Sequence, residues 1–130
     1  MHRCFFYGTL RKGSQTVAGL YQSNMVLPVA HLVGFELYDL GPFPGVVPGK
    51  GTVIGEVHEI DETVLREMDR YEGYNVNKPA TSLFCRELAE AVAPDGTTTP
   101  VWVYLFNNPR QSPLKQPVAS GDWFEHKGLY

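Results

Sequence analysis

The segment from residue 60 to 74, IDETVLREMDRYEGY, most constrains the fold of this chain. Asp61 is a favourable helix N-cap, no glycine or proline interrupts the interior, and Gly73 stands where a left-handed residue commonly ends a helix. At a period of 3.6 residues, Leu65 and Met68 fall on one face, while the arginines and most of the acids fall on the other. The segment therefore predicts one amphipathic helix packed on an apolar core.

Glu72 departs from this pattern, because it continues the apolar face. It follows Leu65 by seven residues and Met68 by four. A carboxylate at a helix end among apolar side chains is partly desolvated, which raises its pKa and suits a general base. The alternative is that the helix has already ended and the side chain turns to water. Spacing alone leaves both interpretations open.

Length and composition limit the class of protein. A chain of 130 residues, 43% of them hydrophobic, suits one globular domain spanning 1–130. The net charge of −3, without a basic run, argues against nucleic-acid binding. The apolar runs are too short to cross a bilayer, and the N-terminus lacks a signal-peptide pattern. We therefore expect a cytoplasmic protein with no nucleic-acid or membrane partner.

The cysteines and histidines indicate no metal chemistry. Cys4 and Cys85 lie far apart in strand-like runs and are predicted to be free core residues. The four histidines have no ligand spacing among themselves or with the cysteines. We predict no metal site and no other cofactor.

The rest of the chain is rich in strand patterns. Strand-like stretches occur at 4–7, 27–38, 52–60, 82–92 and 101–106, with a short helix expected at 15–23 and a tail docking through 121–124. With the shorter fragments between them, we expect six or seven strands and one main helix. The short spacing and glycine-rich bends favour an α+β fold, either a small mixed β-barrel or a curled sheet.

Two loops and one strand offer further site residues. Gly8 directly follows the first buried strand, where converging backbone amides could hold an anion; an ordinary turn is the alternative. The rigid loop at 39–45 carries Phe43, which is either a plug over the core edge or a pocket wall. Tyr104 lies on the face of its strand from which the hydroxyl could reach a cavity.

Four motifs occur in order: FYGTL at 6–10, GPFPG at 41–45, GEV at 55–57 and MDRYEGY at 68–74. Together they resemble the γ-glutamylcyclotransferase-like superfamily, particularly its γ-glutamylamine cyclotransferase and plant avirulence-induced branch. The resemblance spans about residues 4 to 123. The YGTL form is closer to that branch than to the glutathione-pathway enzymes.

The resemblance implies a small barrel with a cavity at one end and a specific reaction. The α-amine of a γ-glutamyl compound attacks its own γ-carbonyl, releasing 5-oxoproline and a free amine. Carried over, the substrate-binding positions are Tyr7, Gly8, Thr9 and Leu10, and the acid/base is Glu72. We expect a monomer whose partner is a small γ-glutamyl compound.

One departure concerns the family's aromatic-X-Arg triplet, which commonly follows the glutamate closely. Here the nearest match is Phe84-Cys85-Arg86, delayed by an insert at 75–83. Arg86 is thus either a substrate-binding residue or a structural one, and the insert is expected to reshape the cavity mouth. A non-catalytic relative that binds a small amino-acid-like ligand is the alternative function; a protein-interaction module would leave Glu72 unexplained.

Overall fold

The structure is a computed structural model that describes residues 1–8, 10–11, 23–108, 110–114 and 116–130. Almost all of the short helix expected at 15–23 lies outside these residues. The elements, in chain order, are β1 (His2–Phe6), β2 (Asn24–Asp39), β3 (Pro44–Ile60), α1 (Glu62–Tyr71), a 3₁₀ turn (Pro79–Thr81), β4 (Phe84–Val92), β5 (Thr98–Phe106) and α2 (Trp123–Lys127).

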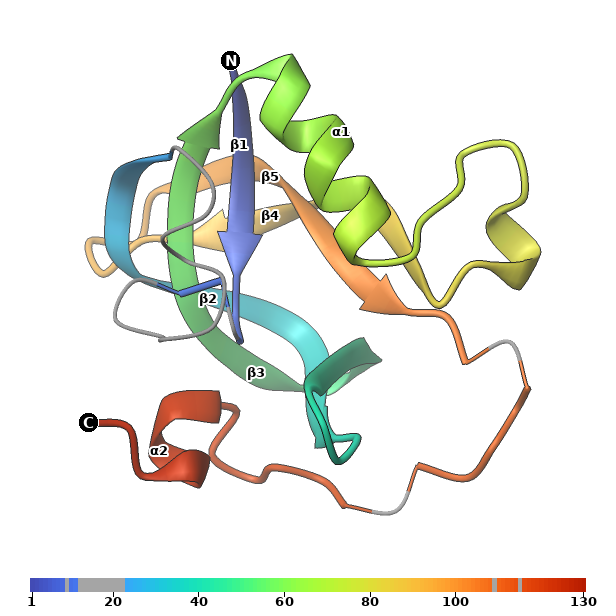
Figure 1. Ribbon diagram of the computed structural model, residues 1–130. Coiled ribbons are helices and arrows are strands. Elements are labelled where there is room, and N and C mark those ends of the chain that lie inside the picture. The colour runs from blue at the N-terminus through green and yellow to red at the C-terminus, as the bar shows by residue number, and fades with distance from the viewer. Residues whose placement is uncertain (9, 12–22, 109, 115) are drawn as a thin grey trace.

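The strands form a closed barrel in the order β1-β3-β2-β4-β5. Neighbouring strands are antiparallel except for β1 and β5, which meet in parallel at Cys4 and Trp102 and close the barrel. Figure 1 shows α1 and α2 on opposite sides of this barrel. The predicted α+β class and the barrel with one main helix are confirmed.

The prediction of six or seven strands is wrong, because the described residues form five. β2 has 16 residues and β3 has 17, and their pairing shifts register between Leu27 and Ala30 and again between Val33 and Phe35. Pro28 lies within the first shift and Gly34 within the second. Such bulges bend a strand without ending it, so breaks in the sequence pattern became curvature of continuous strands.

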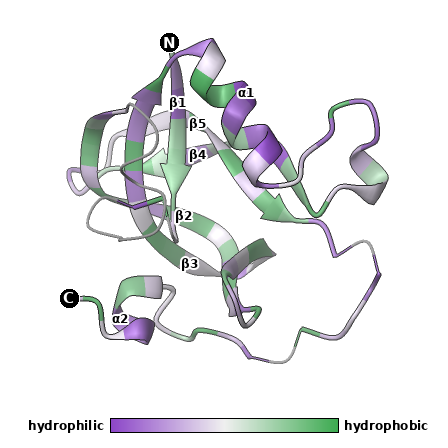
Figure 2. Cartoon of the chain, viewed as in Figure 1, coloured by the Kyte–Doolittle hydropathy of each residue, from purple (hydrophilic) through white to green (hydrophobic). Residues whose placement is uncertain are grey.

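Helix α1 forms as the sequence predicts. The Asp61 carboxylate accepts a hydrogen bond from the Val64 N–H at 2.8 Å, and Gly73 ends the helix with a φ of 71°. Leu65 and Met68 are fully buried, and in Figure 2 apolar and polar segments alternate along α1. One face of the helix is therefore part of the core.

Two apolar clusters make up the core. The first fills the barrel and includes the side chains of Trp123 and Phe124 from α2, so the C-terminal segment docks as expected. The second lies between the barrel and α1 and includes Leu65, Met68, Phe84 and Tyr104. Among the described residues, no helix is both long and apolar enough to span a membrane.

Candidate active site

A cavity of about 230 Å³ lies at the edge of the second cluster, where α1 ends. Six of the residues singled out from the sequence line it: Tyr7, Gly8, Leu10, Phe43, Glu72 and Tyr104. Residues far apart in the sequence thus line one cavity. Thr9 lies outside the described residues.

Glu72 occupies the C-cap of α1, and its N–H donates to the Met68 carbonyl at 2.9 Å. With the helix continued to this point, Glu72 lines the cavity. The residue as a whole is only partly buried, but the carboxyl lies among apolar walls. Burial raises the pKa of Glu72 to about 7, because the cavity disfavours the charged form.

Tyr7 is a wall of the cavity whose hydroxyl is already engaged. It donates a hydrogen bond of 2.6 Å to the backbone carbonyl of Tyr104 on β5. Burial, and then the nearby Glu72 carboxylate, raise the pKa of Tyr7 well above its usual value. The phenol is therefore a fixed, neutral support that connects the end of β1 to β5 across from Glu72.

Position 8, between β1 and the 39–45 loop, has room for glycine but not for a larger residue. A Cβ at this position would lie 2.5 Å from Cγ of Pro44, closer than any real contact. The Gly8 carbonyl also accepts a hydrogen bond from the Arg11 N–H at 3.0 Å, forming a tight turn. Gly8 and Leu10 both line the cavity.

Phe43 is a pocket wall. Its ring lies 5.7 Å from that of Phe84, in the layer between the barrel and the cavity. Six further residues complete the lining and were not predicted as site residues: Phe5, Phe6, Pro44, Tyr71, Leu83 and Phe84. Leu83 comes from the end of the 75–83 insert, so this insert does contribute to the cavity wall.

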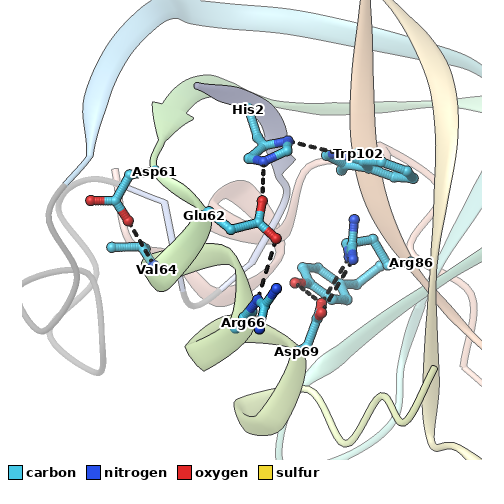
Figure 3. Close-up of polar contacts among 9 residues, drawn as sticks. His2, Asp61, Glu62, Val64, Arg66, Asp69, Arg86 and Trp102 are labelled. Carbon is cyan, nitrogen blue, oxygen red and sulfur yellow. Dashed lines mark hydrogen bonds and ion pairs between the residues drawn. The ribbon is translucent and has the colours of Figure 1, made fainter. Parts of the chain in front are cut away.

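Arg86 does not line the cavity. Its guanidinium donates two hydrogen bonds to Asp69, at 2.8 and 3.2 Å, and lies 4.3 Å from the Trp102 ring centre (Figure 3). The hydroxyl of Tyr104 donates to the same carboxylate at 2.7 Å. Arg86 and Tyr104 therefore hold α1 to β4 and β5 through Asp69. Tyr104 lines the cavity, but its hydroxyl is engaged with Asp69.

Asp69 is the supporting residue that sequence reasoning missed. It follows Leu65 by four residues, so it borders the apolar face on which Glu72 also lies. That spacing was the available signal. The Asp69–Arg86 ion pair holds α1 against the barrel three residues before Glu72. Asp69 therefore helps to position the end of the helix, and with it Glu72, relative to the barrel.

The site can perform proton transfer. A carboxyl group whose pKa is near neutrality can accept and return a proton at physiological pH. It lines an apolar cavity that Gly8 and Leu10 also line. Within the described residues, no group of three or more His, Cys, Asp or Glu side chains is arranged to hold a metal ion.

A closed five-stranded barrel with one main helix and a cavity at that helix end defines a protein of the γ-glutamylcyclotransferase fold class. The chain belongs to the family described as gamma-glutamyl cyclotransferase, AIG2-like, whose model matches residues 4–125.

Individual relatives are similar over nearly the whole chain. A putative gamma-glutamylcyclotransferase from Vibrio cholerae is 34% identical, covering 94% of this chain and 95% of its own. The solution structure of Escherichia coli YtfP, a protein named in the gamma-glutamylcyclotransferase family, matches with a TM-score of 0.65 and 30% identity, covering 96% of this chain and 98% of its own. A Niallia circulans protein named gamma-L-glutamyl-butirosin B gamma-glutamyl cyclotransferase is 31% identical, covering 82% of this chain and 68% of its own.

Proposed function

We propose that this protein catalyses the cyclisation of a small γ-glutamyl compound to 5-oxoproline with release of a free amine. The observation that carries the proposal is the Glu72 carboxyl in an apolar cavity, with its pKa raised to about 7. Family membership and the name of the Niallia circulans relative support the same reaction class.

The reaction needs one proton carrier. The substrate α-amine is an ammonium at neutral pH, and Glu72 takes one of its protons so that the nitrogen lone pair can attack the γ-carbonyl carbon. A new C–N bond closes the five-membered ring and the original amide C–N bond breaks. Glu72 returns this proton to the departing nitrogen, then takes the second proton from the ring nitrogen and passes it to the released amine. The products are 5-oxoproline and an ammonium, and no water or cofactor is consumed.

The remaining residues hold the substrate in a folded conformation. In this proposal the backbone amides of Gly8 and Leu10 bind the α-carboxylate. Tyr7 and Phe43, which line the cavity, form the walls around the carbon chain. Ring closure is intramolecular, so holding the amine near the carbonyl supplies much of the rate gain. Arg86 acts indirectly, by positioning α1 through Asp69.

A panel of γ-glutamyl compounds tests this function. We expect 5-oxoproline and the free amine to appear in equal amounts from at least one γ-glutamyl amino acid, isopeptide or polyamine conjugate. The matching α-glutamyl isomers are the control, because they carry no γ-amide to cleave. If compounds of the panel raise the melting temperature of the protein but yield no 5-oxoproline, the non-catalytic ligand-binding alternative would be favoured instead.

The pH profile of kcat/KM should show the raised pKa of Glu72. Only the ionised carboxylate accepts a proton, so activity should fall about tenfold per pH unit below the pKa of about 7. Initial rates between pH 5 and 8 on an accepted substrate measure this limb. A limb centred near pH 4.5, as for an exposed glutamate, would contradict the desolvated base.

A further inference from the structure

A second hollow, a groove of about 600 Å³, lies beside the catalytic cavity. It runs between the 39–43 loop, the end of the 75–83 insert and the segment that follows β5. The residues that decide its character are Asp39, Phe43, Leu83, Phe106, Arg110 and Leu114.

The groove borders the cavity, because Phe43 and Leu83 line both. The cavity holds about 230 Å³, below the roughly 300 Å³ at which pockets for whole drug-sized ligands begin. It therefore suits the glutamyl part alone. The group attached to the γ-amide then needs space outside the cavity, and the groove beyond Phe43 and Leu83 is the neighbouring hollow.

Most of the groove wall is apolar, and its two charged residues differ sharply. The Asp39 carboxylate is already paired with His126 Nε2 at 2.9 Å and Lys127 Nζ at 3.3 Å. Arg110 is exposed, and its guanidinium has no hydrogen-bond or ion-pair partner within the described part of the chain. The groove thus offers one free positive charge and no free negative one.

We propose that this groove binds the leaving-amine part of the substrate, and that Arg110 selects amines that carry a carboxylate and an apolar side chain. The substrate class is then a γ-glutamyl amino acid or short γ-glutamyl peptide rather than a γ-glutamyl polyamine. This inference rests on the proposed cyclisation and adds a specificity-determining residue to it.

A matched pair of substrates isolates the carboxylate. γ-Glutamyl-leucine and γ-glutamyl-leucinamide have nearly the same shape, but only the first carries the charge that Arg110 would bind. We expect kcat/KM to favour the acid by roughly three- to tenfold, the range for a partly exposed charged hydrogen bond. A γ-glutamyl diamine of similar length should be the poorest of the three substrates.

Arg110→Gln should bring the ratio of acid to amide close to one. The change should appear as a raised KM for the acid with kcat kept, because the contact is made equally in the ground state and the transition state. Lys50→Gln is the matched control, because it removes the same charge from an exposed position outside the groove lining. Lys50 lies six residues along β3 from Pro44, which corresponds to about 20 Å of extended strand. Lys50→Gln should leave the ratio unchanged.

The outcomes separate this inference from the proposed function. Turnover with the same ratio in the wild type and Arg110→Gln, or a wild-type preference for the amide or diamine, would overturn the role of Arg110 alone. If no compound is turned over, calorimetry with the same three compounds still measures binding. A preference for the acid that Arg110→Gln abolishes would then uphold the groove while the cyclisation fails, and no binding at all would end both proposals.

Discussion

Glu72→Gln is expected to abolish nearly all release of 5-oxoproline while leaving the protein folded. Glutamine keeps the shape and hydrogen-bonding reach of the side chain in the cavity but cannot accept a proton. Loss of a general base typically lowers kcat on the order of 10²–10⁴-fold. The measurement is turnover on whichever γ-glutamyl compound the wild type accepts, and substrate binding should change little because the walls remain.

Glu67→Gln is the matched control, since Glu67 is exposed on the same helix and outside the cavity lining. It should retain nearly wild-type activity. Wild-type turnover by Glu72→Gln would remove the proposed acid/base and move the non-catalytic binding function ahead. A comparable loss in both variants would point to damage to α1 rather than to proton transfer.

Stability provides an independent readout of the same residue. The pKa of Glu72 rises on folding from 4.5 to about 7, so the folded state holds the proton more tightly than the unfolded state. The resulting stabilisation is fully present below pH 4.5 and is lost as pH rises through about 7. Because glutamine never ionises, the variant should gain relative to the wild type over that window, by roughly 1–3 kcal/mol once solvent screening is allowed for.

Thermal melts at pH 5 and pH 8 measure this effect. The melting temperature of Glu72→Gln should rise relative to the wild type by several degrees between the two conditions. A difference that stays constant with pH would show that the carboxyl is well solvated. That result would contradict the desolvated base even if the variant were inactive.

The second large effect is expected at a buried ion cluster behind the Gly8 turn. Arg11 donates to Asp122 at 2.9 Å and to the Tyr130 hydroxyl at 3.0 Å, and that hydroxyl donates to Asp122 at 2.6 Å. Arg11 and Asp122 are only 4% and 6% exposed. The guanidinium also lies 4.0 Å from the Phe124 ring centre. The C-terminal segment thereby holds the turn that lines the cavity.

Asp122→Ala should destabilise the protein by about 3–5 kcal/mol, because it leaves the buried guanidinium without its main anionic partner. The value should lie toward the lower end, since Glu56 Oε2 remains 3.6 Å from Arg11 Nε. Chemical denaturation measures the change in unfolding free energy. Loss of the α2 cap, which accepts from the N–H groups of Phe124 and Glu125, contributes roughly 1 kcal/mol of the total.

Asp61→Ala separates the two contributions. Asp61 caps α1 in the same way but is exposed, so its removal should cost only about 1 kcal/mol. Replacing both charged partners, as Arg11→Met with Asp122→Ala, should recover part of the loss, because no buried guanidinium is then left without Asp122 and Glu56 keeps its contact with His58 at 2.9 Å. Equal costs for the two single aspartate variants would show that the Arg11–Asp122 pair adds nothing beyond the cap.

Helix α1 and the position of Glu72 on it can be predicted from the local amino-acid pattern. These follow from short-range physics: the Asp61 cap, the 3.6-residue period through Leu65 and Met68, and Gly73 at the end are all set within 15 residues. The turn at the glycine after β1 and the rigid loop around Phe43 could be predicted for the same reason, because glycine and proline restrict or free the backbone locally.

The contacts between distant segments could not be predicted in this way. The parallel closure of β1 on β5, the bulges that merged strand fragments into β2 and β3, and the pairing of Arg86 with Asp69 all join residues far apart in the chain. Local propensity carries no information about such contacts, because their free energy comes from burial and pairing that exist only once the barrel has closed. The groove beside the cavity and the free charge of Arg110 belong to the same class, since both arise where loops from separate strands come together.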